Sequence, residues 1–432
     1  MEEPAGADLV VVNTCTVTQA ADREGRRLVR RLAARLGPGR VVVTGCSAQR
    51  DPGPYAAVRG VRLVAGNSHK ERLPELLGAV PPGGEQATGA PPVLVEPPAG
   101  ARPQARVRGL LAGGSSSNAR AYLRVQDGCG QSCTFCTLPA VRGGSASLPL
   151  DAARREAALL AAAGHGEIVL TGAHLGSYGY DLSPRVPLAA LVEAVLAAAP
   201  ACRVRLSSLE PRFVGPELLR LLAAEPRLCP HLHLPLQSGD DRVLARMRRA
   251  YRSGPYAERA RAAAAAVAGA AAGGPGLALG SDFIVGFPGE DDAAFAATVR
   301  RIEELPFTYG HVFPYSDRPG TPAAGFDGRV HRDVTRRRGA VLRRLLREKG
   351  LAFRRAHLGA RVEIVVESVA DAGGAAIDGP PRWLARGTSE RFLPVWVTGR
   401  GAPPAVASRL ALRVTATDDE GLVGESGPPV LG

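Results

Sequence analysis

Long apolar runs are missing from this sequence of 432 residues, and so are two other features of membrane or exported proteins. No run reaches the roughly 18–20 apolar residues that a helix needs to cross a bilayer. The short apolar stretch near Met1 has no basic region ahead of it, as a secretion signal would have. Seven cysteines are too few for a disulfide scaffold in a chain of this length. These absences predict a cytoplasmic protein whose clustered cysteines bind metal.

Acidic residues are also in short supply, because 41 Asp and Glu face 54 Lys and Arg. The resulting net charge of +13 favours a polyanionic partner, with nucleic acid as the first candidate. Hydrophobic residues make up 45% of the chain, enough to bury substantial cores. At roughly 100–200 residues per domain, the length predicts two or three domains.

The N-terminal part, residues 1–80, has an α/β pattern. Val10–Val12, Val41–Val43 and Val61–Ala65 are short β-branched runs, and an Arg-rich helical stretch separates the first two. Residues 81–118 are rich in Pro, Gly and Ser, which predicts a linker between domains.

Residues 119–328 alternate between apolar strand patterns and Ala-rich helical patterns. The predicted strands are Tyr122–Val125, Glu167–Thr171, Arg203–Ser207, His231–Leu236, Leu279–Val285 and Gly310–Pro314. Six such units predict an α/β fold with a parallel sheet and helical crossovers. The sheet is either an open doubly wound sheet or a partial barrel, and both place function at the carboxyl ends of the strands.

The C-terminal part begins with a predicted basic helix, residues 329–357, which carries eleven Arg and Lys residues that could contact phosphates or form a solvated face. Residues 358–432 contain five short strand patterns separated by Gly and Pro turns, which predicts a small β-barrel of a kind that often binds nucleic acid. Phe392 and Trp396 could stack on bases, and for Trp396 we predict a place in the barrel core.

The most specific feature is the segment Cys129-Gly-Gln-Ser-Cys133-Thr-Phe-Cys136, which follows the first predicted strand of the six-unit region. Three thiolates at this spacing can bind three corners of a cubane iron–sulfur cluster, and no fourth cysteine lies nearby, so one iron stays open to another ligand. A structural zinc site normally has four ligands, and no histidine is close enough in the sequence to complete one. Zinc binding and a chance group of free cysteines remain the alternatives.

At these residues the chain resembles the radical S-adenosylmethionine (SAM) superfamily, whose signature lies after the first strand of a partial (β/α)₆ barrel. The resemblance implies a [4Fe–4S] cluster on Cys129, Cys133 and Cys136, whose open iron binds the amino and carboxylate groups of SAM. Cleavage of SAM then gives a 5′-deoxyadenosyl radical, while the protein orients the cofactor. Phe135 resembles the aromatic residue beside the adenine in that family, and loop packing is an equal alternative.

Further segments are similar to motifs of the tRNA and ribosomal-protein methylthiotransferases. Two of them, around Cys15 (NTCTVT) and Cys46 (TGCSAQ), follow the N-terminal strands. The other motifs come in family order and are Thr171–Gly179, Leu206–Pro211, His233–Gly239, Asp282–Glu290 and His311–Ser316, with a TRAM-like stretch at Gly387–Val397. The residues of several of these motifs resemble most closely those of the branch that acts on N6-threonylcarbamoyladenosine at position 37 of tRNA.

Each motif lies at or just beyond the carboxyl end of a predicted strand. For cofactor binding we therefore predict, besides Phe135, a set of close-approach glycines and polar side chains: Gly172, Ser208, Glu210, Gln237 and Gly286. Turn formation and strand-end capping are the alternatives for this set. Arg142 resembles a family position near the substrate entrance, with a surface arginine as the alternative. We assign no catalytic residue beyond the cluster ligands, and leave out His174, His231 and His233 because histidines at strand ends are more often structural.

In the methylthiotransferases the N-terminal domain binds a second [4Fe–4S] cluster through three cysteines. Cys15 and Cys46 match two of these, and none of the fourteen residues before Cys15 is a cysteine. We therefore expect that the N-terminal domain is truncated at its start, either by a start codon placed downstream of the true one or in a shortened copy. Occupancy of the second cluster is left open by the sequence.

Together these features predict an enzyme that inserts a methylthio group at C2 of N6-threonylcarbamoyladenosine 37 in tRNA. The resemblance implies that one SAM methylates sulfur and a second SAM supplies the radical. The expected partners are the anticodon loop of tRNA, whose bases can be splayed out, and an electron donor such as flavodoxin or ferredoxin, and we expect a monomer. Alternatives are a methylthiotransferase for isopentenyladenosine in tRNA or for a ribosomal protein, and a non-catalytic RNA-binding protein whose cysteines hold zinc.

Overall fold

The computed structural model describes residues 7–79, 91–96, 119–270, 275–371 and 382–425, so most of the predicted 81–118 linker lies outside the described residues. The chain forms two compact units. Unit 1 comprises residues 1–106, 128–146 and 316–326, and unit 2 comprises residues 107–127, 147–315 and 327–432. The cysteine loop after the first barrel strand and the segment after the last one therefore belong to unit 1. The domain limits drawn from the sequence stay a prediction.

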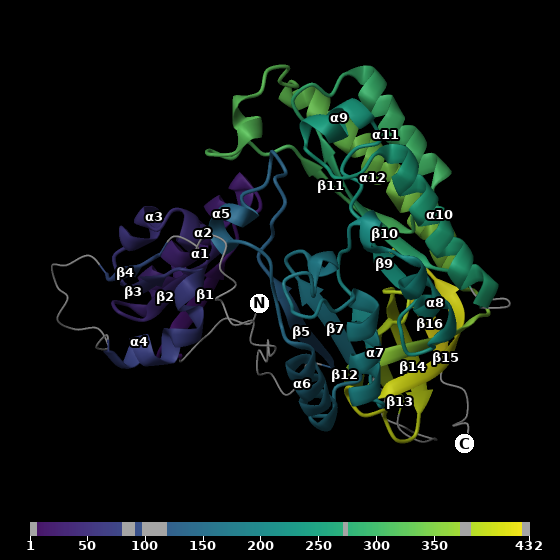
Figure 1. Ribbon diagram of the computed structural model, residues 1–432. Coiled ribbons are helices and arrows are strands. Elements are labelled where there is room, and N and C mark those ends of the chain that lie inside the picture. Colours follow the sequence, from purple (N-terminus) through teal and green to yellow (C-terminus); the bar gives the residue numbers. More distant parts are fainter. Residues whose placement is uncertain (1–6, 80–90, 97–118, 271–274, 372–381, 426–432) are drawn as a thin grey trace. The chain divides into compact units, whose positions relative to one another are not determined.

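A four-stranded parallel sheet forms the centre of unit 1, in the order β1-β2-β3-β4 (Figure 1). Its strands are β1 (Val10–Thr14), β2 (Val41–Gly45), β3 (Val61–Ala65) and β4 (Val93–Leu94). The helical segments of unit 1 are α1 (Gln19–Leu36), α2 (Cys46–Arg50), α3 (Gly53–Ala56), η1 (Asn67–Arg72), α4 (Leu73–Ala79), α5 (Leu138–Arg142) and η4 (Pro322–Gly325). All five residues of β2 are buried, which explains its unbroken valine run.

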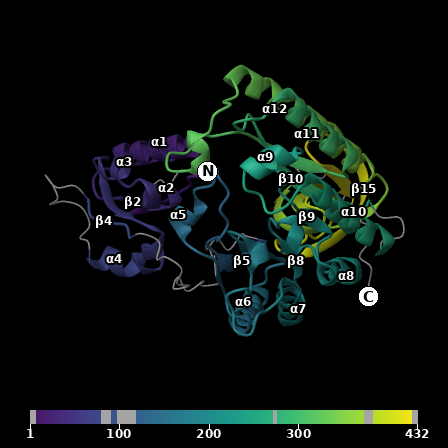
Figure 2. The same ribbon diagram turned by 45° about the horizontal axis from the view of Figure 1, so that its top comes forward.

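Six parallel strands form the core of unit 2. They are β5 (Arg120–Asp127), β7 (Glu167–Gly172), β8 (Arg203–Leu206), β9 (His231–His233), β10 (Ala278–Val285) and β11 (Tyr309–Pro314). The first three pair in the order β5-β7-β8, with β6 (Ala146–Ser147) at the edge, and the others pair in the order β9-β10-β11. Single bridges, one of them between Ser208 and His233, connect β8 to β9. The partial barrel is therefore confirmed, and because its strands are parallel their carboxyl ends share one edge. Figure 2 labels four of these strands, β5, β8, β9 and β10.

Helices follow each barrel strand, as the alternating pattern predicts. They are α6 (Leu150–Ala162), η2 (Leu175–Ser177), α7 (Leu188–Ala198), η3 (Pro211–Phe213), α8 (Pro216–Ala224), α9 (Asp241–Arg246), α10 (Ser253–Ala270), α11 (Asp292–Glu304) and α12 (Arg332–Arg355). Of these, α6, α7 and α12 pack against β5, β8 and β11. In the described part of the chain, no helix combines the length and the apolar character that a membrane span requires.

The C-terminal strands close into a five-stranded barrel, as expected. Its order is β12 (Arg361–Asp371), β13 (Arg382–Ser389), β14 (Pro394–Arg400), β16 (Leu422–Glu425) and β15 (Arg409–Thr417). The prediction that Trp396 fills its core was wrong. Val395 and Val397 point inward and are fully buried, so the alternation of the strand turns Trp396 outward, beneath the guanidinium of Arg386. Trp383 on β13 is the tryptophan of the core.

A buried group of charges joins the two barrels of unit 2. Arg203 and Arg205 on β8 project to the same side, and their Nε atoms lie 2.6 and 2.8 Å from the carboxylate oxygens of Glu167 on β7. The remaining guanidinium N–H groups donate to main-chain carbonyls of the small barrel, those of Glu363, Thr388, Ser389 and Glu390. These contacts satisfy charges that would otherwise be costly to bury.

Candidate functional site

The loop after β5 turns back on itself immediately before the first cysteine. Gly128 has φ +70°, and a Cβ at this position would overlap the carbonyl of Gly144. The turn is completed by the backbone N–H of Cys129, which donates to the carbonyl of Gly143 over 3.0 Å. Only glycine fits both the positive φ and the close approach, so this turn explains the glycine that precedes the motif.

The three cysteines of this loop are not joined in disulfides. Backbone N–H groups of Gln131 and Leu138 donate to the sulfurs of Cys129 and Cys136, each over 3.4 Å. Such donors stabilise thiolates, the form that binds iron. The donor set thus fits a [4Fe–4S] cluster, and the ligand role of Cys129, Cys133 and Cys136 stays a prediction. Phe135 is half-buried in the same loop.

The second pair of cysteines lies at the carboxyl ends of two neighbouring strands of unit 1. Thr14 of β1 pairs with Gly45 of β2, and the next residue in each case is a cysteine, Cys15 or Cys46. Two side-chain donors face the sulfur of Cys46: Arg142 Nε at 3.3 Å and Asn67 Nδ2 at 3.6 Å. Arg142, which the sequence placed near a substrate entrance, therefore contacts a predicted cluster ligand.

Positive charge exceeds negative charge next to Cys15. The guanidinium of Arg318, only 1% exposed, donates to Asp22 over 2.7 Å and to the hydroxyl of Thr16, while Arg50 lies 3.3 Å from the same carboxylate. Burial alone would raise the pKa of Asp22, but hydrogen bonds from Ser47, Thr16 and Arg318 outweigh it and the pKa is lowered. Among the described residues, Nε and Nη1 of Arg318 have no hydrogen-bond partner.

Two arginines thus share one carboxylate, which favours an anionic group such as a thiolate-bound cluster in this part of unit 1. Cys15 and Cys46 are the cysteines that residues 7–79 offer to it. Arg318 was not singled out from the sequence. The only signal was its position two residues after the His311–Ser316 motif.

The predicted cofactor residues of unit 2 lie along the carboxyl edge of the partial barrel. Gly172 ends β7, Ser208 follows β8, Gln237 follows β9 and Gly286 follows β10. Gln237 bridges to Phe283 and has φ +69°, which places it in a strained left-handed conformation. The structure brings these residues to neighbouring strand ends, and their contact with SAM stays a prediction.

Glu210 is the most constrained of these residues. It is 6% exposed, and two guanidinium groups and an imidazole surround its carboxylate: Arg249 Nη2 lies at 2.7 Å, Arg212 Nε at 3.2 Å and His174 Nε2 at 3.3 Å. Burial would raise its pKa, but the contact with His174 and the charge of Arg249 outweigh this and lower it. A carboxylate held in this way orients Arg249 and His174, in addition to any contact with a cofactor.

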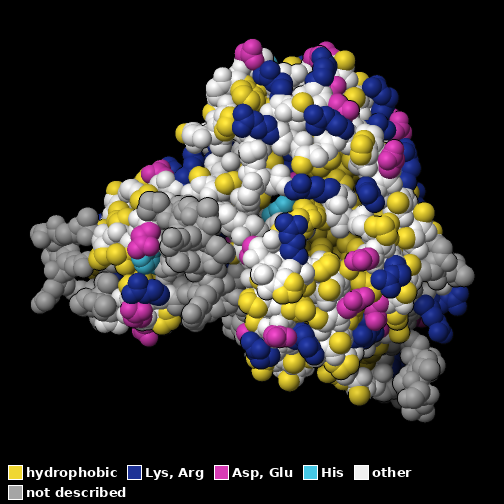
Figure 3. Space-filling view, in the orientation of Figure 1, with side chains coloured by type: hydrophobic (Ala, Val, Ile, Leu, Met, Phe, Trp, Pro, Cys, Tyr) yellow, Lys and Arg dark blue, Asp and Glu magenta, His cyan; other side chains and the backbone are white. Residues whose placement is uncertain are grey.

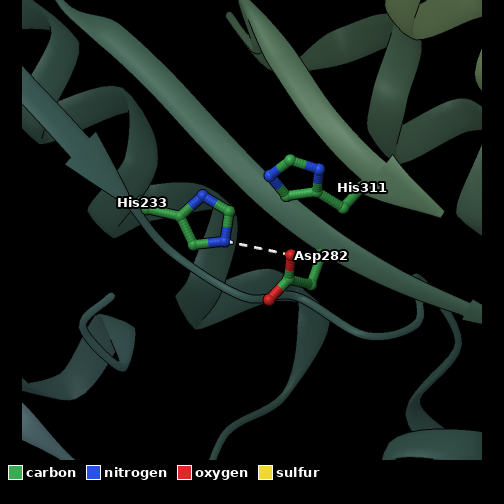
Figure 4. A group of neighbouring side chains, drawn as sticks. All are labelled: His233, Asp282 and His311. Carbon is green, nitrogen blue, oxygen red and sulfur yellow. Dashed lines mark ion pairs between the residues drawn. The ribbon is translucent and has the colours of Figure 1, made fainter. Parts of the chain in front are cut away.

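Sequence reasoning missed one polar group inside the partial barrel. His233, Asp282 and His311 come from β9, β10 and β11, and each offers one ligand atom within 4.8 Å of the others (Figure 4). The separate motifs contained all three residues, but nothing in the sequence showed that they meet.

Comparisons with known proteins identify the family of this chain. The model of the radical SAM superfamily matches residues 123–302, and that of an uncharacterised family, UPF0004, matches residues 1–66. The threonylcarbamoyladenosine tRNA methylthiotransferase MtaB of Bacillus subtilis is 36% identical over 333 residues, which cover 77% of this chain and 70% of that protein. This chain belongs to the radical SAM methylthiotransferase family.

Two further relatives of this methylthiotransferase differ in the names they carry. The MtaB of Aquifex aeolicus is 33% identical, with 83% of this chain and 84% of that protein covered. A tRNA-2-methylthio-N(6)-dimethylallyladenosine synthase of Parafrankia sp. is 36% identical, with 92% of this chain and 77% of that protein covered. Among solved structures, the radical SAM methyltransferase TsrM of Kitasatospora setae has a TM-score of 0.53 at 18% identity, covers 73% of this chain and 65% of its own, and shows the same fold.

Proposed function

We propose that this methylthiotransferase acts on tRNA and inserts the methylthio group at C2 of N6-threonylcarbamoyladenosine 37. The supporting observation is its similarity, at 36% and 33% identity over most of the chain, to two proteins named for that substrate. The family implies SAM and a [4Fe–4S] cluster, which Cys129, Cys133 and Cys136 would hold. Bound there, they would supply the radical that activates the C2–H bond, while the chain orients the nucleoside and excludes water.

A basic surface on unit 2 supports tRNA as the substrate. Seven arginines of α12 are exposed: Arg332, Arg336, Arg337, Arg343, Arg344, Arg347 and Arg355. Arg338 is instead buried, 2.6 Å from Glu290, and anchors the helix. Several Lys and Arg side chains, interspersed with Asp and Glu, are visible on the upper part of unit 2 (Figure 3). Such a surface can contact backbone phosphates without sequence preference. Recognition of the base is then left to the partial barrel.

Dimethylallyladenosine is a second candidate substrate, because the Parafrankia relative named for it is also 36% identical. The two nucleosides share the adenine ring and differ in the N6 substituent, which is a charged ureido amino acid in one and an apolar alkene in the other. Expression of the full chain in a bacterial strain that lacks its own C2-methylthiolation enzymes decides between them. We expect mass analysis of digested tRNA to show 2-methylthio-threonylcarbamoyladenosine, and methylthio-dimethylallyladenosine alone would refute the assignment.

Two serine variants test whether the cysteine loop carries the chemistry. Cys129→Ser removes a predicted ligand, and we expect loss of the brown colour, of cluster iron and of 5′-deoxyadenosine formation after anaerobic reconstitution. Cys202→Ser is the matched control, because the buried thiol of Cys202 donates to the carbonyl of His165 over 2.9 Å and a hydroxyl can do the same. A Cys129→Ser protein with wild-type iron content would contradict the site. A colourless wild-type protein that binds zinc would support the non-catalytic alternative.

A further inference from the structure

The group formed by His233, Asp282 and His311 lies inside the partial barrel, next to the predicted cofactor edge. Asp282 of β10 is directly opposite His311 of β11, and His233 of β9 bridges to Ser208. His233 Nε2 lies 3.1 Å from Asp282 Oδ1, as Figure 4 shows. The imidazole of His311 packs against that of His233 with ring centroids 5.7 Å apart. Three strands thus deliver three polar side chains to one place.

A chain of hydrogen bonds reaches this group from the floor of the barrel. The hydroxyl of Tyr309 lies 2.8 Å from His231 Nε2 and 3.1 Å from His233 Nδ1. Burial, and then the charge of Arg205, lower the pKa of His231 well below its usual value, so His231 is neutral. A neutral ring has one N–H, and the position of that hydrogen decides the direction of every bond in the chain.

The buried Nδ1 of His231 identifies this direction, because it has no hydrogen-bond partner in the described part of the chain. If Nδ1 carried the hydrogen, an N–H donor would be left unpaired, which costs about 1–3 kcal/mol. We therefore assign the hydrogen to Nε2, which donates to Tyr309. Tyr309 then donates to His233 Nδ1, and His233 Nε2–H donates to Asp282.

This direction disfavours a metal ion and favours a hydrogen-bonding organic group. A metal would need the Nε2 lone pair of His233, which the assigned direction occupies with a hydrogen. Asp282 instead stays an acceptor with free lone pairs, held in place from behind by His233. The side chain of Asp282 is 23% exposed and His311 is exposed, so both are open to a ligand. Phe313, two residues beyond His311 and 40% exposed, adds an apolar ring beside them.

We propose that Asp282 and His311, positioned by His233 and Tyr309, bind the N6 substituent of the substrate nucleoside and select threonylcarbamoyl over dimethylallyl. The proposal rests on the function proposed above. A ureido group has N–H donors for the Asp282 carboxylate, and the threonyl hydroxyl and carboxylate are partners for the His311 ring. A dimethylallyl group has neither, and would remove water from both side chains without replacing its hydrogen bonds, which is the strongest basis for rejecting an analogue.

Binding of the full-length protein to two anticodon stem-loop RNAs tests this proposal without depending on turnover. The RNAs are identical except that one carries threonylcarbamoyladenosine and the other dimethylallyladenosine at position 37. We expect the wild-type protein to bind the threonylcarbamoyl RNA at least about tenfold more tightly, the size of one charge-assisted hydrogen bond. Asp282→Asn and His311→Phe should each remove most of this preference by weakening the binding of the threonylcarbamoyl RNA.

His331→Phe is the matched control for the loss of an imidazole, because His331 is exposed at the start of α12 and outside the barrel interior. It should keep the preference, even if affinity for both RNAs falls. Melting temperatures show whether each variant is folded. If the Asp282→Asn and His311→Phe proteins are both folded and keep the wild-type preference, the proposal is wrong. If the wild-type protein forms only methylthio-dimethylallyladenosine in cells, it is the proposed function that fails, so the two failures can be distinguished.

Discussion

Replacing Glu167 by glutamine is expected to destabilise unit 2 by about 3 kcal/mol at neutral pH. The carboxylate of Glu167 is fully buried between Arg203 and Arg205. Burial raises its pKa, but the charges of Arg205 and Arg203 outweigh this and lower the pKa from 4.5 to about 2. A lowering of this size corresponds to about 3 kcal/mol, and breaking a buried ion pair elsewhere costs about 3–5 kcal/mol. The two arguments agree on the order of magnitude.

The pH dependence follows from the direction of the shift. Because the folded-state pKa lies below the unfolded-state value, the stabilisation by Glu167 is fully present above about pH 4.5 and is lost as the pH falls toward 2. Glutamine does not titrate, so the wild-type advantage should be constant near neutrality and shrink in acid. Thermal unfolding followed by circular dichroism measures this, and at pH 7 the variant should melt about 6 °C or more below wild type.

Glu367→Gln is the matched control in the same part of unit 2. Glu367 pairs with Arg120 over 2.9 Å, but both side chains are about a quarter exposed, at 28% and 22%. Pairs that contact solvent contribute at most about 1 kcal/mol, so this variant should melt close to wild type. Equal, small effects of the two substitutions, or a Glu167→Gln effect that persists unchanged in acid, would refute the assignment of this ion-pair group as a structural link.

Two further predictions concern the RNA surface and the hydrogen-bond chain. Changing Arg343 and Arg347, both exposed on α12, to glutamine should weaken tRNA binding and reduce the slope of log affinity against log salt by about two, whereas glutamine at the exposed Arg154 and Arg155 of α6 should leave the slope unchanged. A slope that stays at the wild-type value in the α12 variant would exclude phosphate contact there. Gly280→Ala should displace Tyr309, because the new Cβ would overlap its ring, so we expect a lower melting temperature and a smaller preference for the threonylcarbamoyl RNA. A folded Gly280→Ala protein with the wild-type preference would show that the Tyr309 bonds do not position Asp282.

Local sequence determined the elements and the chemistry of the cysteine loop. Val41–Val43 predicted a strand because β-branched residues favour strands, and β2 is found there. The cysteine spacing predicted an iron–sulfur ligand set, and membership of the radical SAM methylthiotransferase family agrees with it. These inferences succeed because strand alternation, helix periodicity and ligand spacing are properties of neighbouring residues. The same reasoning misplaced Trp396, since a strand pattern gives the period but not which of its two faces is inside.

Only the tertiary structure decided which distant residues meet. His233, Asp282 and His311 are far apart in the sequence, and they converge because the register of the parallel strands pairs Asp282 with His311 and places His233 beside Gly280, two residues before Asp282 on β10. Arg142 meets Cys46, and Arg318 meets Asp22, for the same kind of reason. The sequence by itself therefore determined the secondary-structure elements of the chain and the enzyme family to which it belongs. Strand order and register decided which charges are paired and which remain open to a ligand, because both depend on packing between segments that no local pattern records.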